Sequence, residues 1–375
     1  MQVVRYVGAV LGGAIVLWSS ASVLQTLITP GTQVERLYKT VDRGMDHLFH
    51  VLGRPFPEYQ HRYRLLTFQA PLTLMAVFAT WVVSYLVGYS LLLWPSTKHL
   101  ADAVREAGSS MFTLGFMSSR GGGPTTIDFI AGATGMIIVA LQIAYLPTLY
   151  TAFNRRETEV TLMAVRGGLP AWGPEILART RYVIATEELP GFYRQWERWL
   201  AELGESHSSY PILLRFRSPD PFASWVLSML AVLDSAALYW SVSPESAPRE
   251  ARLCLAMGFR ALRQIARTLG VPYQEDPRPD QGTALTREEF DQGMVRLQDV
   301  GFHMDRTPDE AWPHFQGWRV NYEPLAYLLA YKLDAVPAAW SGPRRSGEQP
   351  IPTKRVVNRT PDNPEGVAPA YPGVR

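Results

Sequence analysis

The sequence predicts an all-α membrane protein, with three transmembrane helices, a re-entrant helix and loop, and a cytosolic helical domain. Only 19% of the 375 residues are charged, whereas soluble domains carry about a quarter. The charges are missing from three long windows near the N-terminus, and strand-like alternation is scarce, with Tyr210–Phe216 the best short candidate for a strand. A formal net charge of +2 gives no indication of nucleic-acid binding, and the single cysteine excludes a disulfide scaffold.

Each of the three windows is long enough to cross a bilayer. A spanning helix needs about 20 apolar residues, and the windows Tyr6–Ile28, Ala70–Trp94 and Phe129–Phe153 contain no Asp, Glu, Lys or Arg. Buried core helices are the alternative, but three such windows within the first 155 residues favour membrane spans. For the first window a cleaved signal peptide competes. Its apolar run continues beyond a short signal core, which favours a retained anchor.

The distribution of Lys and Arg predicts the orientation. Residues 30–67 contain six Lys or Arg and four Asp or Glu, and Arg155, Arg156 and Arg166 follow the third window. Basic loops mark the cytoplasmic side, so we expect both segments inside, the N-terminus outside and the C-terminal domain in the cytoplasm. A multi-pass protein of the plasma membrane is thus expected, and residues 95–124 must begin and end on its outer face.

The outer segment has the features of a re-entrant loop. Residues 99–112 have helical spacing, with Thr97 or Ser96 as the expected N-cap, but they are too short and too polar to cross the membrane. A stretch of small residues and the flexible residues 121–124 then return the chain to the same face. Non-helical backbone at membrane depth is tolerated only where it is buried in protein or lines water. The loop therefore predicts a pore or a binding cavity.

The run Thr113-Leu114-Gly115-Phe116, which follows a short helix and lies between two spans, resembles the filter of two-transmembrane pore-loop cation channels of the potassium-channel superfamily. That family has Thr-Val-Gly-Tyr-Gly, and the resemblance covers about residues 66–156. It implies a pore helix before the loop, a permeant monovalent cation such as K⁺, and a homotetramer, because one loop cannot encircle an ion. A surface hairpin between two helices is the simpler alternative.

The sequence departs from that family at the end of the loop. Met117 replaces the second filter glycine, and Ser118 replaces the acidic residue that commonly follows. A left-handed conformation at methionine costs about 1–2 kcal/mol, so a non-selective cation pore is an alternative to a potassium-selective one. The expected ion-selectivity filter comprises Thr113, Leu114, Gly115, Phe116 and Met117.

Three further residues have two interpretations each. Gly135 and Pro147 lie in the third window, where the resemblance implies a gating hinge, but glycines also serve close helix contacts in membranes. Asp128 directly precedes that window. It is expected either to attract cations at the pore mouth or to cap the helix.

From residue 155 to residue 340 the composition is that of a soluble helical domain. Periodicity predicts helices over Phe192–Leu203 and Arg249–Leu269, and from the capping box Thr286-Arg-Glu-Glu289 through Val300. Glu310–Leu333 is expected to be one helix or a helix pair, interrupted by Pro313 and Pro324. Residues 222–242 approach the length of a span, but Asp234 in their middle favours a core helix. The tail after Ser341 is rich in Pro, Gly and Arg and is expected to be disordered.

The sequence gives no reason to expect an enzyme or a resident cofactor, because no nucleotide-binding, metal-binding or hydrolytic motif has supporting context. Arg215 and Arg217 flank an aromatic residue and are candidates for holding an anion, although a loop joining two helices is the simpler interpretation. The expected organisation is an anchor (1–29), a cytosolic basic linker (30–67), a pore module (68–154), a cytosolic helical domain (155–340) and a tail (341–375).

Two functions are compatible with this organisation. The first is a tetrameric cation channel regulated by its cytosolic helical domain, whose ligand the sequence does not identify. The second is a membrane-anchored sensor or scaffold, in which the helical domain binds a ligand or partner and the spans only tether it. The lipid bilayer is a partner in both, and nucleic acid is a partner in neither.

Overall fold

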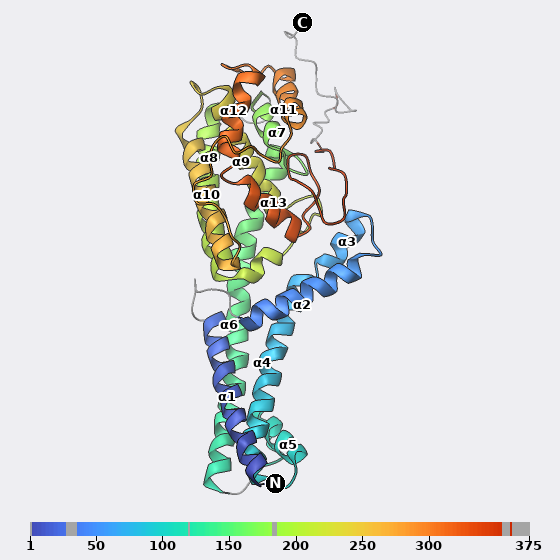
Figure 1. Cartoon of the computed structure of the whole chain (residues 1–375), viewed down its shortest axis with the longest axis vertical. Helices are drawn as coiled ribbons and strands as arrows, with labels where there is room; N and C mark the ends of the chain where they lie inside the picture. Colours follow the sequence, from blue (N-terminus) through green and yellow to red (C-terminus); the bar gives the residue numbers. More distant parts are fainter. Residues whose placement is uncertain (1, 28–35, 119–120, 182–185, 355–360, 362–375) are drawn as a thin grey trace.

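The structure is a computed structural model that describes residues 2–27, 36–118, 121–181, 186–354 and 361. The described chain is elongated, with an apolar helical bundle at one end and a larger helical domain at the other (Figure 1). Its described residues form helices and no strand beyond isolated bridges. Four helices are long and apolar enough to cross a membrane: α1 (Gln2–Leu27), the stretch Tyr59–Ser96 that contains α4 (Gln69–Leu93), α6 (Gly122–Gly167) and α9 (Trp225–Val242).

The apolar bundle consists of α1, α4, the short helix α5 (Leu100–Met111) and residues 122–154 of α6. Helices α1 and α4 are antiparallel and approach closely through glycine. A Cβ atom on Gly12 would lie 2.5 Å from the Gly88 carbonyl oxygen, so only glycine fits there. The Trp81 indole donates to Ser22 Oγ (2.9 Å) further along the same contact. Small residues and buried hydrogen bonds of this kind are typical of helix pairs in membranes.

The segment predicted as a basic linker is helical and folded. It contains α2 (Arg36–Gly53) and α3 (Tyr59–Leu66), which form an elbow leading into α4 (Figure 1). Leu37 and Tyr38 of α2 are buried in the same cluster as Ala70 and Leu74 of α4. The linker prediction rested on charge alone, whereas α2 also has apolar residues at helical spacing, which bury one side of it.

Helix α6 is continuous from the apolar bundle into the helical domain. Its 46 residues correspond to about 70 Å, so the predicted window Phe129–Phe153 is only its apolar part. The helix continues through residues 157–165 into the helical domain. The helix ends before Gly168, whose φ of +78° favours glycine.

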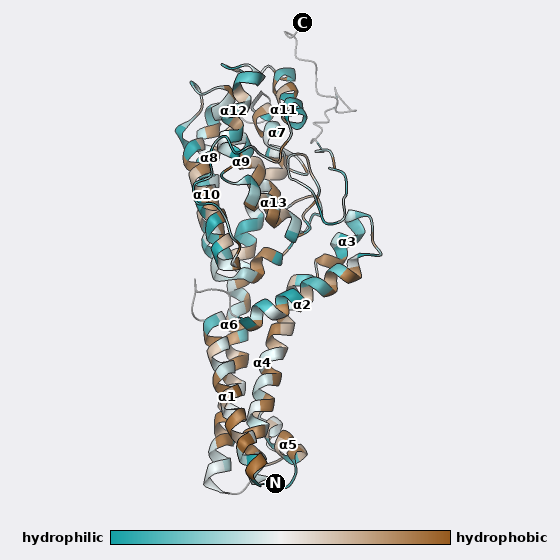
Figure 2. Cartoon of the chain, viewed as in Figure 1, coloured by the Kyte–Doolittle hydropathy of each residue, from teal (hydrophilic) through white to brown (hydrophobic). Residues whose placement is uncertain are grey.

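The helical domain surrounds α9, of which every residue except Trp240 is buried. Figure 2 shows hydrophilic residues on the outside of this domain and apolar residues along the bundle. The bounds of the surrounding helices are α7 (Gly173–Ala178), α8 (Leu189–Ser209), α10 (Arg249–Leu269), α11 (Arg287–Asp299), α12 (Pro308–Arg319) and α13 (Glu323–Lys332). The capping box of Thr286 and Glu289 forms at the start of α11 as predicted.

Asp234 in the middle of α9 is neutralised inside the helical domain. The Tyr322 hydroxyl donates to its Oδ1 atom (2.7 Å), and Arg319 Nη1 lies 3.4 Å from the same oxygen. Arg319 also pairs with Glu323 (3.0 Å), which accepts the amides of Ala284 and Leu285. A charge in the middle of an apolar helix thus has partners on α12 and α13, as expected of a core helix.

The predicted strand at Tyr210–Phe216 is wrong, because Pro211–Arg215 forms a 3₁₀ helix directly after α8. Proline fixes φ near −65°, which suits a helical turn. The Leu213 amide donates to the Tyr210 carbonyl (2.9 Å), and Leu213 is fully buried. The turn therefore buries apolar side chains without pairing to any other strand.

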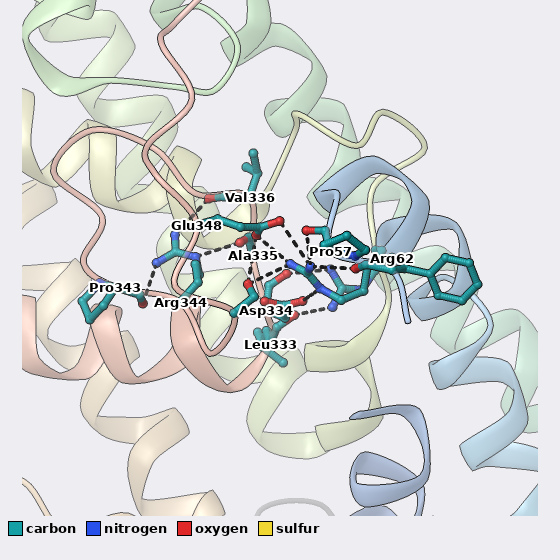
Figure 3. Close-up of polar contacts among 12 residues, drawn as sticks. Pro57, Arg62, Leu333, Asp334, Ala335, Val336, Pro343, Arg344 and Glu348 are labelled. Carbon is teal, nitrogen blue, oxygen red and sulfur yellow. Dashed lines mark hydrogen bonds and ion pairs between the residues drawn. The ribbon is translucent and has the colours of Figure 1, made fainter. Parts of the chain in front are cut away.

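The predicted disorder of the tail is wrong for residues 341–354, which pack on the helical domain, whereas most of residues 355–375 lie outside the described residues. Arg344 is buried and donates to the carbonyls of Ala335 (2.7 Å) and Val336 (2.9 Å) (Figure 3). Arg62 of α3 pairs with Asp334 (2.6 Å) and Glu348 (2.7 Å). Buried arginine side chains therefore hold this segment in place, together with the packing of Ile351 on the core and backbone bridges at Ile351 and Lys354.

Candidate functional site

The candidate site lies where α5 packs between α4 and α6. Residues 97–98 lie at the same end of the bundle as the N-terminus, because Arg5 donates to the carbonyls of Thr97 (3.0 Å) and Lys98 (2.7 Å). Residues 36–66 and the helical domain lie at the other end (Figure 1). The predicted N-cap is wrong: α5 begins after His99, with no side-chain cap, since the chain is extended at Thr97 and His99.

The C-terminal end of α5 lies deep beside α6. A Cβ atom on Gly135 would lie 1.9 Å from the Met111 carbonyl oxygen, and one on Gly132 would lie 3.3 Å from the Ser110 carbonyl oxygen. Gly135 is thirteen residues into α6, or about 20 Å from its start. The chain then returns from Met111 to the start of α6 at Gly122 through the loop that contains the predicted filter residues.

Ser109, near the C-terminal end of α5, holds this loop through hydrogen bonds to its backbone amides. Its carbonyl oxygen accepts the amides of Leu114 (2.8 Å) and Gly115 (3.4 Å), and its hydroxyl oxygen accepts the amides of Phe116 (3.0 Å) and Met117 (3.1 Å). Ser109 itself is buried. Four consecutive backbone donors of the loop thus converge on one serine at the end of α5.

Among the described residues, the carbonyl oxygens of the loop accept no hydrogen bond. This holds for the carbonyls of Thr113, Leu114, Gly115 and Phe116. Two of these residues have left-handed backbone, Thr113 (φ +55°) and Gly115 (φ +71°), whereas Met117 does not. Carbonyl oxygens freed in this way are the groups that coordinate dehydrated cations in channel filters.

Two apolar side chains of the loop are more than half exposed. Leu114 and Phe116 are 62% and 59% exposed, and Phe112 before them is 51% exposed. At the level of the apolar bundle, exposed aliphatic and aromatic groups need lipid or another protein surface around them. One face of α6 is similarly uncovered, with Phe129 75% and Ile143 67% exposed.

Asp128 connects α6 to α5. Its Oδ1 atom accepts a hydrogen bond from Ser110 Oγ (2.7 Å). The helix cap interpretation of Asp128 is wrong, since α6 begins at Gly122 with Gly121 as its uncapped N-cap residue. Its role at a pore mouth stays a prediction. A second polar contact joins α4 to α6, between Tyr89 and Thr134 (2.6 Å).

Gly135 and Pro147 lie within unbroken helix. The close approach of Met111 gives Gly135 a packing role, one of the two interpretations offered for it. Thr151 Oγ1 donates to the Pro147 carbonyl (2.8 Å), one turn earlier in the same helix. A hinge at either residue stays a prediction.

The guanidinium groups of Arg215 and Arg217 are engaged by the protein itself. Arg215 pairs with Asp42 and Asp46 of α2, each at 2.7 Å. Arg217 donates to the carbonyls of Asp334 (3.1 Å) and Leu333. These contacts favour the structural interpretation over an anion site. Among the described residues no group of three or more His, Cys, Asp or Glu side chains is placed to hold a metal ion.

A second polar centre lies where α6 enters the helical domain. Arg156 is buried, donates to the carbonyls of Leu213 (2.8 Å) and Phe216 (2.7 Å), and lies 3.1 Å from His207 Nε2. Burial, reinforced by the charge of Arg156, lowers the pKa of His207 well below its usual range. A cleft of about 570 Å³ adjoins this region, between the helices that carry Thr151 and Glu202.

No protein-family model matches the chain, and no curated protein or solved structure matches it. The site therefore rests on its own geometry. The sequence placed residues 113–117 in one loop, and the structure brings them together with Ser109, Ser110 and Asp128. Ser109 was missed, and the available signal was a pair of serines in the last turn of a predicted helix, where hydroxyl groups bond to nearby backbone.

Proposed function

We propose that the chain assembles as a homotetramer in the plasma membrane and conducts monovalent cations through a pore lined by residues 113–117. The observation that carries this proposal is the convergence of four loop amides on Ser109. With the donors held behind the loop, its carbonyl oxygens are available to replace the hydration shell of a cation. Because each chain supplies one such loop, four copies are needed to surround an ion.

The arrangement of helices supports a re-entrant pore helix. Helix α5 starts at the end of the bundle that holds the N-terminus, runs to the level of Gly135 and is followed by a return to the same end. Its C-terminal carbonyls carry the negative end of the helix dipole, which favours cations near the loop. The basic segments lie at the opposite end, and the positive-inside rule therefore favours a cytoplasmic helical domain and a loop on the outer side.

Potassium is the cation that the resemblance favours, with a non-selective pore as the alternative. The cost expected at Met117 does not arise in this geometry, because Met117 is not left-handed. Thr113, two residues before the predicted filter glycine Gly115, has that conformation instead, as does Gly115 itself. A loop with one glycine is therefore compatible with free carbonyls, although it differs from the five-residue pattern of the family.

The test is conduction in reconstituted bilayers, with potassium and sodium compared. Gly115→Ala is the informative variant, because open space surrounds its Cβ position and only its φ of +71° opposes a side chain. Gly123→Ala is the matched control, with equally open space in a helical position. We expect Gly115→Ala to reduce or alter the current and Gly123→Ala to leave it unchanged. A wild-type protein that forms tetramers without current, or equal currents in both variants, would remove the filter assignment.

The alternative is a membrane-anchored sensor or scaffold. The cleft of about 570 Å³ beside α6 favours a ligand for the helical domain in either case. The oligomeric state distinguishes the regulated channel from the tethered module that does not conduct. A protein that is monomeric or dimeric in mild detergent cannot form the proposed pore, and the tethered module would then be the function to pursue.

A further inference from the structure

Helix α2 divides its charges between two sides. Its two acidic residues face the helical domain: Arg215 binds Asp42 and Asp46 at 2.7 Å, and Arg345 binds Asp46 at 3.2 Å. Burial raises the pKa of Asp46, but the two guanidinium charges outweigh it and lower the pKa overall. Both carboxylates are thus neutralised inside the protein.

The side of α2 away from the helical domain exposes apolar residues near its C-terminal end. At about 100° per residue, Leu48 and Val51 lie on the side of the helix opposite Asp42 and Asp46. Leu48 is 47% and Val51 41% exposed, and the neighbouring Leu52 is exposed to a similar degree. Residues 48–52, little more than one turn near the C-terminal end of α2, therefore present three apolar side chains to the surroundings.

Basic residues border this apolar side. Arg36, Arg43 and Arg54 are exposed, and no described carboxylate pairs with them. With Asp42 and Asp46 paired to arginines, the exposed residues of α2 include basic and apolar side chains, together with Thr40, His47 and His50, and no carboxylate. This combination is the signature of a helix that lies in the interface of a membrane with anionic lipids.

The position of α2 in the molecule fits this surface. It lies between the apolar bundle and the helical domain and leaves the bundle at an angle (Figure 1). Gln69, the first residue of α4, lies 3.4 Å from Asp46. Because α4 has 25 residues, or about 37 Å of helix against about 30 Å of hydrocarbon, its first turn belongs at the headgroup level.

We infer that α2 is an interfacial helix whose exposed side binds anionic phospholipid, with Leu48, Val51 and Leu52 at the acyl boundary and Arg36, Arg43 and Arg54 at the headgroups. We take membrane insertion of the bundle from the proposed function, but conduction is not required. The acidic side of the same helix pairs with Arg215 and Arg345 of the helical domain. Helix α2 therefore connects lipid bound on one side to the helical domain on the other.

The experiment uses single cysteines in the full-length protein. The chain has one native cysteine, Cys254, which is fully buried, so introduced thiols are the accessible ones. Leu48→Cys and Val51→Cys are labelled with an environment-sensitive fluorophore in nanodiscs of phosphatidylcholine, with or without phosphatidylglycerol. Val295→Cys on α11, 53% exposed at the far end of the helical domain, is the matched control.

We expect a blue shift and quenching by spin-labelled lipid at residues 48 and 51, both stronger with phosphatidylglycerol, and neither at residue 295. Each arginine should add roughly fivefold to partitioning onto an anionic surface. Arg43→Gln with Arg54→Gln should therefore shift the response to a higher phosphatidylglycerol fraction, whereas the exposed pair Arg252→Gln with Arg260→Gln should not.

Labels at residues 48 and 51 that stay in water in anionic nanodiscs overturn the inference. So does a shift without lipid quenching, which would mark a second copy or a protein partner on this surface. The readout needs no current, so it fails separately from the pore. Retained gel-filtration profiles for the labelled proteins ensure that the result reports the folded chain.

Discussion

At the scale of single residues, His207 makes stability depend on pH. It is buried against Trp225 and near Arg156, and its pKa lies well below 6.5 in the folded state. Below about pH 6.5 the unfolded chain takes up a proton that the folded chain does not, so stability falls as the pH falls. The expected slope is about 1.4 kcal/mol per pH unit.

Thermal unfolding of the wild type and of His207→Gln between pH 7.5 and pH 5.5 measures this effect. The wild type should lose more stability than the variant over this interval, since only its imidazole gains a proton on unfolding. Parallel curves for the two proteins would contradict the buried neutral histidine.

The ion pair of Asp234 is a second residue whose contribution can be measured. Asp234→Ala leaves Arg319 buried with one partner fewer, and breaking a buried pair from one side costs about 3–5 kcal/mol. Ser228→Ala, equally buried in α9 but outside the ion-pair network, is the matched control. Denaturant unfolding should show a much larger loss for Asp234→Ala, and similar losses in both variants would argue against the network.

Single residues were the hardest scale to predict from sequence. Asp234 and the capping box at Thr286 were recognised because a lone charge in an apolar run and a Thr-x-x-Glu spacing are local patterns. The role of Ser109 depends on a loop folding back on it, and the partners of Arg344 are backbone carbonyls. Neither contact can be predicted from the spacing of residues along the chain.

At the scale of helices, the contact of α1 with α4 is tested by two adjacent glycines. A Cβ atom on Gly12 would lie 2.5 Å from a backbone oxygen of α4, whereas one on Gly13 would lie 3.8 Å from the Leu92 side chain, an ordinary contact. Overpacking costs about 1–3 kcal/mol. Gly12→Ala should therefore lower the melting temperature in detergent and Gly13→Ala should not. Equal melting temperatures for the two variants would contradict the close contact of α1 with α4.

Helices α1, α4 and α6 were predictable because the absence of charge over a long window is a strong signal. Helix α2 was missed although Val41, Met45, Leu48 and Leu52 have helical spacing, because its charges led to the linker interpretation. The depth of α5 follows from its contact with Gly135, which no local pattern reveals. A helix can thus be predicted where one property, such as the absence of charge, dominates its sequence. It is missed where charge and apolar periodicity point to different structures, as in α2.

At the scale of the whole molecule, the uncovered loop and the uncovered face of α6 predict four copies. Native mass spectrometry and chemical crosslinking in mild detergent should give a tetramer, because Leu114, Phe116 and Ile143 otherwise face no protein. A monomer or dimer under the same conditions would contradict the pore. The sequence could not predict which surfaces remain uncovered, since exposure depends on how every helix is placed.

The unbroken course of α6 has a mechanical consequence. About 50 Å of continuous helix joins the start of α6 to the buried Arg156, and its backbone lacks only the hydrogen bond that Pro147 cannot donate. If α6 does not bend at the predicted hinge residues Gly135 and Pro147, a twist applied to the helical domain is transmitted along the helix. A rotation of a few degrees at the domain end would then shift Gly135 relative to the Met111 carbonyl at the end of α5.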